Sequence, residues 1–296
     1  MKNCFEFTLL ILICVLSPFA WADEDVSVIN WQTFHAPPLY MKLGDDQGEG
    51  FIDLILANLF AKLPHYEHRQ PLTTQARAIY DIQLGKQVCH PALFKTSERE
   101  KYAYFSTPSL FTPSNRLLVS AEAVKRHALT SPVDIKRLLE DESVTLGLIS
   151  ARSYGPDLDK VLKQVESQRI LRMPVEKNEV MFTLIARNRI DATIAYPFEL
   201  AYFNRTGQKR SDITALDIKG IPAYAIGYVA CPRNSWGRQV IEHVNTALAE
   251  LVHTPEYVAA MTRWWEEEVE RAEFKSFYAN EFLNAHVKGK TAEPMP

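Results

Sequence analysis

The sequence has 296 residues, of which 47% are hydrophobic and 23% charged, and its formal net charge is −3. This is ordinary globular composition, without a fixed repeat or a low-complexity segment. The two signs of charge are mixed along the chain, so there is no dominant basic face for phosphate binding, and a nucleic-acid partner is excluded.

The first 22 residues have the pattern of a secretory signal peptide. Lys2 gives a short positive region, residues 7–15 are apolar except for one threonine, and Ala20 and Ala22 occupy the small positions of a cleavage site. We predict cleavage after Ala22 and export to the periplasm. The remaining chain is long enough for one large domain or two small ones.

After the signal, strand and helix patterns alternate along the chain. Short β-branched apolar runs predict strands, and apolar residues at helical spacing between turn residues predict helices. The alternation predicts an α/β fold. In chain order we predict a strand over 26–31, a loop over 34–50, helices over 51–60 and 75–84, strands over 88–93 and 116–120, a helix over 135–140, a strand over 144–149, helices over 157–164 and 180–187, strands over 191–195 and 223–231, and a helix over 240–252.

Several short motifs follow one another in a characteristic order. They are Gly48-Glu49-Gly50-Phe51-Ile52-Asp53, the segment from Lys95 to Pro108 that carries Arg99, the run from Gly147 to Gly155, and Asn188-Arg189-Ile190-Asp191-Ala192. This order resembles the extracellular solute-binding proteins of family 3, the periplasmic amino-acid-binding type. The resemblance implies the type II periplasmic binding protein fold, with two α/β lobes joined by two hinge strands around a ligand cleft.

The resemblance also implies the domain boundaries and a disulfide. Lobe 1 would comprise residues 23–115 and 225–268, lobe 2 residues 116–224, and residues 269–296 would form a charged C-terminal extension. Cys89 and Cys231 remain after signal cleavage, and a single pair usually forms a bridge in an oxidising compartment. In the resembled fold their strands are sheet neighbours, which favours a disulfide over two buried free thiols.

The same resemblance assigns roles in the cleft. Arg99 matches the arginine that holds the ligand carboxylate, and its planar fork of donors suits that group. A family serine falls near Phe94 here, and a second-lobe turn falls on Arg152 and Ser153, which predicts a second guanidinium facing the cleft. The position of the acid that binds an ammonium group is taken by Tyr196.

Glu199, one helical turn further, is the candidate substitute for that acid. Two cleft arginines and a displaced acid favour a more acidic or aromatic ligand than a simple zwitterionic amino acid. Trp31 fits core packing better than ligand stacking, and no metal or cofactor is expected. The predicted stacking faces are Phe34, His35, Tyr40 and Tyr196.

We therefore expect a monomeric periplasmic protein that captures a small, carboxylate-bearing ligand for the membrane permease of an ABC transporter. One alternative is a ligand-sensing protein that docks on a membrane receptor. Another is a dehydratase-type enzyme on the same fold, which needs a general acid. The candidates for that acid are Glu98, Glu199 and His90.

Overall fold

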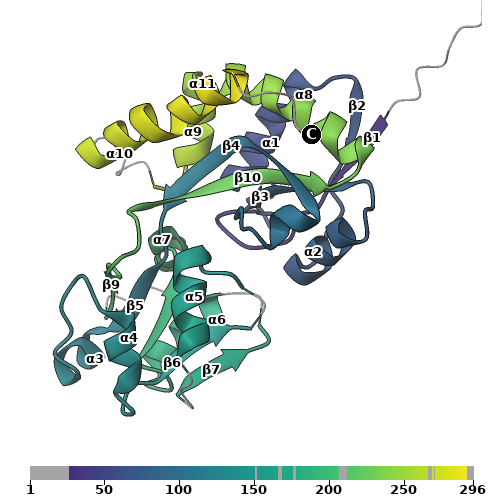
Figure 1. Ribbon diagram of the computed structural model, residues 1–296. Helices are drawn as coiled ribbons and strands as arrows, with labels where there is room; N and C mark the ends of the chain where they lie inside the picture. Colours follow the sequence, from purple (N-terminus) through teal and green to yellow (C-terminus); the bar gives the residue numbers. More distant parts are fainter. Residues whose placement is uncertain are drawn as a thin grey trace, which may run out of the picture.

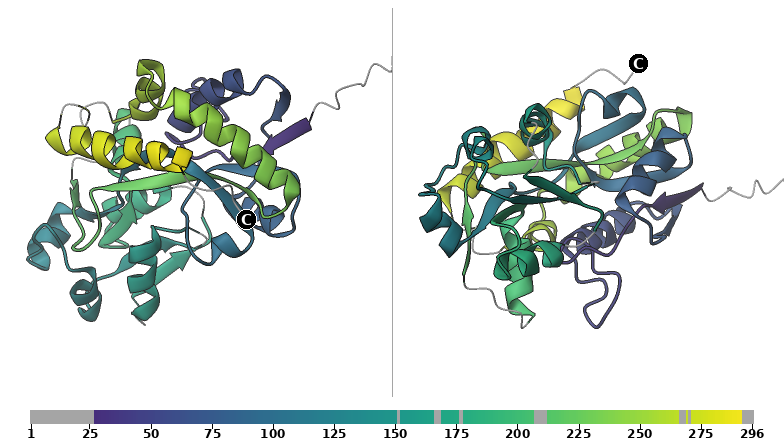
Figure 2. Two further views of the ribbon diagram at one scale, coloured as in Figure 1. Left: turned by 45° about the horizontal axis from the view of Figure 1, so that its top comes forward. Right: turned by 90° about the horizontal axis from the view of Figure 1, so that it is seen from below.

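The computed structural model describes residues 27–150, 152–165, 169–175, 178–206, 212–265, 269 and 271–291. The predicted signal peptide lies outside these residues. Two β-sheets, each covered by helices, form two lobes (Figures 1 and 2). No helix within the described ranges has the length and apolar character needed to cross a lipid bilayer.

The lobe 1 sheet has the strand order β2-β1-β3-β10-β4. Strand β1 runs parallel to β2 and β3, and β10 runs antiparallel to β3 and β4. This sheet therefore combines strands from early in the chain with one that follows all the strands of lobe 2. Its strands are β1 (Ser27–Trp31), β2 (Tyr66–Arg69), β3 (Val88–Leu93), β4 (Ala103–Pro113) and β10 (Tyr224–Pro232).

Side-chain caps set where several of the lobe 1 helices begin. Thr74 Oγ1 accepts a hydrogen bond from the Arg77 N–H at 3.2 Å, and Asn234 Oδ1 accepts one from the Gly237 N–H at 2.8 Å. The second cap starts α8 five residues before the predicted helix over 240–252. These helices and the short 3₁₀ turn η1 are α1 (Phe51–Lys62), α2 (Gln75–Gln83), η1 (Arg99–Lys101), α8 (Ser235–Leu251) and α9 (Pro255–Thr262).

The lobe 2 sheet has the strand order β7-β6-β8-β5-β9. Leu117 and Val119 face one buried layer and Leu118 the other, so β5 is apolar on both faces. The strands are β5 (Arg116–Ser120), β6 (Leu146–Ile149), β7 (Ile170–Met173), β8 (Ala192–Ala195) and β9 (Ile213–Leu216). The helices are α3 (Ala121–Arg126), α4 (Ile135–Glu140), α5 (Pro156–Gln164), α6 (Asn178–Ala186) and α7 (Pro197–Arg205).

Two adjacent segments connect the lobes. Where they leave lobe 1, the Ser114 N–H donates to the Ala223 carbonyl at 2.9 Å. The sequence did not predict β4, which leads into this crossing. Pro108 lies inside that strand, where the register against β10 shifts, and such an irregularity tolerates a proline.

The disulfide prediction is confirmed. Cys89 on β3 is bonded to Cys231 on β10, and both residues are fully buried. Because β3 and β10 are neighbours in the sheet, the bridge ties the early part of lobe 1 to the strand that returns from lobe 2.

The C-terminal segment is a helical layer packed on lobe 1, where we expected a charged extension. Phe111 of β4 is fully buried, and its ring lies 5.3 Å from that of Phe274 and 5.0 Å from that of Phe282. Burying aromatic rings offsets the charge of the surrounding residues, so this segment folds onto the sheet. The layer comprises α10 (Ala272–Phe277), the π-helix η3 (Tyr278–Leu283) and α11 (Asn284–Thr291).

Candidate ligand-binding site

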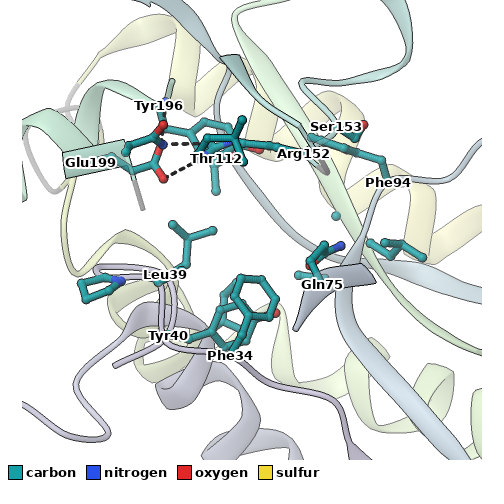
Figure 3. Close-up of a pocket in the computed structure, with 18 of the residues that line it drawn as sticks. Phe34, Leu39, Tyr40, Gln75, Phe94, Thr112, Arg152, Ser153, Tyr196 and Glu199 are labelled. Atoms are coloured by element: carbon teal, nitrogen blue, oxygen red, sulfur yellow. Dashed lines mark hydrogen bonds and ion pairs between the residues drawn. The ribbon is translucent and has the colours of Figure 1, made fainter. Parts of the chain in front are cut away.

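A cavity of about 280 Å³ lies between the two lobes. This is room for one small organic molecule. Most of the lining is apolar. Among the apolar and aromatic lining residues are Phe34, Leu39, Tyr40, Phe51, Ile52, Phe94 and Leu110 from lobe 1, and Ile149, Val175, Phe182, Tyr196 and Tyr202 from lobe 2 (Figure 3).

The loop between β1 and α1 brings Phe34 and Tyr40 to the cavity. Their ring centroids are 4.7 Å apart. The Asp53 carboxylate, on the first turn of α1, accepts a hydrogen bond from the Met41 N–H at 2.7 Å and so fixes the loop. Gly50 is required here, because a Cβ atom would lie 2.6 Å from both the Leu39 carbonyl and the Asp53 carboxylate.

Arg99 lines the cavity from the short turn η1, directly after β3. It is half-buried, and its Nη1 donates to the Phe94 carbonyl at 2.8 Å, which orients the guanidinium. Within the described part of the chain, no carboxylate forms an ion pair with it. Arg99 therefore places an oriented positive charge with further N–H donors at the cavity wall.

His90 and Gln75 lie beside Arg99 on the cavity wall. The Ala92 N–H donates to His90 Nδ1 at 3.1 Å, so the proton of the neutral ring is on Nε2 and is donated to Gln75 Oε1, also at 3.1 Å. Burial, with a smaller effect of the Arg99 charge, lowers the pKa of His90 to about 3. His90 is therefore neutral at physiological pH.

Arg152 and Glu199 form a buried ion pair on the lobe 2 wall (Figure 3). Arg152 Nη1 and Nη2 each donate to one carboxylate oxygen of Glu199 at 2.9 Å. The Arg152 guanidinium also stacks over the Tyr196 ring, 5.2 Å from its centroid. Burial, the largest single cause, would lower the pKa of Arg152, but the charge of Glu199 and its hydrogen bonds, with smaller effects of Tyr154 and Tyr196, together raise that pKa. Glu199 also accepts a hydrogen bond from the Tyr196 N–H at 2.9 Å and so caps α7.

This pair corrects two expectations about cleft charge. We expected Arg152 to be a second guanidinium available to an anionic ligand, but Glu199 already neutralises it. Glu199 was the candidate substitute acid for an ammonium group, and its carboxylate is held by Arg152. The two residues lie 47 positions apart, so only the folded chain reveals that they meet.

The cavity brings together eight of the nine predicted ligand-binding residues. They are Phe34, Tyr40, Phe94, Arg99, Arg152, Ser153, Tyr196 and Glu199. The ninth, His35, is absent from the lining, and its Nδ1 accepts a hydrogen bond from the Lys42 N–H at 3.2 Å. Trp31 is fully buried in the core, as expected. The described residues contain no cluster of three or more His, Cys, Asp or Glu side chains suited to a metal ion.

Sequence reasoning missed several polar lining residues, among them Gln75, Asn178 and Glu179. Gln75 is the first residue of α2, and Asn178 and Glu179 are the first two of α6. We predicted α6 to begin at residue 180, so both of its polar positions fell outside the predicted element. Their type and position at a helix start were the only signals available.

Aromatic contacts connect the lobes beside the cavity. Phe198 on α7 packs edge-on against Phe51 on α1, with ring centroids 5.5 Å apart. Tyr202 meets the Trp264 ring at 5.3 Å, and the Arg205 guanidinium lies 5.0 Å from the centroid of the same ring. The lobes therefore touch through side chains of α7 as well as through the two connecting segments.

Two sheet-based lobes around a cavity define the fold of two-lobed periplasmic binding proteins, as the sequence resemblance predicted. The arginine-, lysine-, histidine-binding protein ArtJ of Geobacillus stearothermophilus is similar with a TM-score of 0.62 at 17% identity, covering 84% of this chain and 99% of that one. No known protein-family profile and no curated protein sequence matches the chain.

Sensor domains are similar to the same extent. The periplasmic VFT2 domain of BvgS from Bordetella pertussis has a TM-score of 0.59 at 19% identity, with 81% of this chain and 94% of that chain covered. A histidine kinase sensor domain with similarity to periplasmic binding proteins has a TM-score of 0.64 at 11% identity, covering 81% and 96%. At these identities the similarities show the fold and leave the ligand open.

Proposed function

We propose that the protein is a periplasmic solute-binding protein. It captures one small, carboxylate-bearing molecule of amino-acid size between its lobes and delivers it to the membrane permease of an ABC transporter. Lobe closure around the ligand is the hinge motion of such proteins. Two observations support the site: the cavity volume of about 280 Å³ and the half-buried Arg99 on its wall.

Arg99 carries the proposal. Its guanidinium is oriented by the Phe94 carbonyl and retains N–H donors for the two oxygens of a carboxylate. Glu179 lines the cavity from the opposite lobe and is half-buried, so it supplies an acid for an ammonium group in place of Glu199. A zwitterion that spans the lobes would then meet one charge of opposite sign on each side.

A thermal-shift screen of the mature protein tests this function. The screen covers amino acids, aromatic acids, dicarboxylates, polyamines and peptidoglycan fragments. A ligand at a hundredfold excess over its Kd should add about 2.7 kcal/mol of stability. A response limited to polyamines would contradict a carboxylate ligand.

A variant pair tests the anchor. Loss of one partner from a desolvated charge pair costs about 2–5 kcal/mol, so Arg99→Ala should weaken binding of the ligand found by roughly thirtyfold or more. Arg77→Ala is the matched control, because Arg77 is exposed on α2 and pairs with Asp81. If the two variants bind equally well, Arg99 is not the anchor.

A sensory role is the second candidate, and the similarity to sensor domains favours it. In that role the ligand-bound protein docks on a membrane receptor, using the outer faces of the lobes that a permease would use. Co-purification from membranes separates the two: a permease as the ligand-dependent partner supports transport, and a receptor supports sensing.

The site gives little support to a dehydratase. The pKa of His90 is about 3 and its Nε2 proton is already donated to Gln75, so it is no general acid at neutral pH. Glu199 is held by Arg152, and Glu98 is exposed and absent from the cavity lining.

A further inference from the structure

The floor of the cavity is one face of the lobe 1 sheet. Successive side chains of a strand point to opposite faces of a sheet, and six lining residues fall at alternate positions of three neighbouring strands. Strand β10 pairs with both β3 and β4, and Gly227 lies opposite Leu110, so the three strands share one surface. The six residues of the floor are His90 and Ala92 on β3, Leu110 and Thr112 on β4, and Ala225 and Gly227 on β10.

The floor is built largely from small side chains. Ala92 and Ala225 are partly exposed, and Gly227 has no side chain at all. A Cβ atom at Gly227 would lie 3.2 Å from Leu110 Cδ1 and 3.6 Å from Ala92 Cβ. Glycine therefore lets these neighbours come together without a side chain that projects between them. The result is a low apolar surface at the bottom of a cavity of about 280 Å³.

Larger apolar side chains border the floor. Phe34 and Leu39, from the loop before α1, and Phe94, directly after β3, are each partly exposed at the cavity. Figure 3 shows Phe34 and Leu39 across from the Arg152–Glu199 pair. A ligand group that lies on the floor would therefore contact apolar atoms beneath it and beside it. Each methylene group that it buries there should strengthen binding about fourfold.

The charges of the described lining residues are already matched. Arg152 and Glu199 neutralise each other through two hydrogen bonds. Arg99 and Glu179 accommodate the carboxylate and ammonium groups of the proposed function. A further charge on the ligand, placed on the floor, would lose its hydration without gaining a partner among the described residues.

We propose that the floor is a side-chain subsite and that the ligand is a carboxylate with a neutral, apolar side chain. This inference rests on the proposed function and adds the substrate class to it. Arg99 holds the carboxylate, and the floor selects the side chain by its size and its lack of charge. Basic and acidic amino acids are therefore poor ligands.

A ligand series on the mature protein tests the substrate class. Isothermal titration calorimetry of L-alanine, L-2-aminobutyrate, L-norvaline and L-norleucine lengthens an apolar side chain one methylene group at a time, and affinity should rise about fourfold per step. L-Lysine is L-norleucine with a terminal ammonium group, and L-glutamate is L-norvaline with a terminal carboxylate in place of its methyl group. Each should bind at least tenfold more weakly than its apolar counterpart.

Substitutions in the floor test its location. Ala225→Leu fills space above the floor, so it should weaken L-norleucine tenfold or more and L-2-aminobutyrate much less. Ala92→Leu repeats this test on β3, and circular dichroism shows whether each variant is folded. The matched control is Ala57→Leu, because Ala57 is exposed on α1 and absent from the cavity lining. Arg99→Ala should instead weaken every member of the series alike.

The results separate this subsite from the proposed function. Affinity that does not rise along the series, L-lysine that binds as tightly as L-norleucine, or folded floor variants that bind normally would overturn the subsite. If only a dicarboxylate or a basic amino acid binds, and Arg99→Ala weakens it, the subsite fails while the carboxylate anchor stands. If no carboxylate in the series or in the broad screen binds, the proposed function fails as well.

Discussion

Removing one member of the Arg152–Glu199 pair should destabilise lobe 2 strongly. The side chains are 17% and 7% exposed, and both carboxylate oxygens are engaged by the guanidinium. Breaking a buried pair of this kind typically costs about 3–5 kcal/mol, because the remaining charge is left without a partner. For a chain of this size that corresponds to a fall in Tm of roughly 6–20 °C.

The effect should be strongly non-additive. Arg152→Leu combined with Glu199→Leu leaves no buried charge, so the double variant should lose much less stability than the two single losses together. Urea unfolding followed by circular dichroism measures all four proteins of this cycle. If each single substitution costs under about 1 kcal/mol and the double is additive, the pair is solvated, and the argument that it neutralises the lobe 2 wall is refuted.

Four further predictions can be checked on the purified protein. His90 has a lowered pKa of about 3, so its contribution to folding stability should be complete above pH 6.5 and should be lost as the pH drops towards 3, by up to about 1.4 kcal/mol per pH unit. In urea unfolding at several pH values, His90→Gln should reduce this dependence of stability on pH. The denatured, unreduced protein should show no free thiol at Cys89 or Cys231, and reduction should cost on the order of 5 kcal/mol; two free thiols would disprove the bridge. Deleting residues 272–296 should lower the Tm by several degrees, because it uncovers buried aromatic rings; an unchanged Tm would show that the layer is not part of the core. N-terminal sequencing of periplasmic material should find cleavage after Ala22, and an intact terminus would contradict the signal.

Local signals in the sequence predicted much of the fold. The apolar run of β5 was predicted with its observed bounds, residues 116–120, and α4 likewise with residues 135–140. Both are short elements whose pattern depends only on their own residues. Strand β4 was missed because Pro108 interrupts its strand pattern. The pairing of β4 with β10 joins segments more than a hundred positions apart, so no local pattern indicates it.

The site was predictable only in part, for a similar reason. Arg99 belongs to a compact local motif, so its place on the cavity wall could be inferred. The ion pair of Arg152 with Glu199 depends on a contact between distant segments, which the order of residues does not encode locally. The C-terminal layer follows the same rule, since its rings become core only against Phe111.

If the proposed function holds, the side-chain contacts between the lobes bear on how a membrane partner distinguishes loaded from unloaded protein. The contacts of Phe198 with Phe51 and of Tyr202 with Trp264 involve protein groups alone, so they stabilise the lobe arrangement of this structure whatever occupies the cavity. The apparent affinity of a protein for its ligand is its intrinsic affinity multiplied by the fraction of molecules in the binding-competent state. In the proposed function, a population that adopts this arrangement without ligand strengthens capture, but it also presents a bound-like surface to the membrane partner and so sets a basal level of transport or signalling.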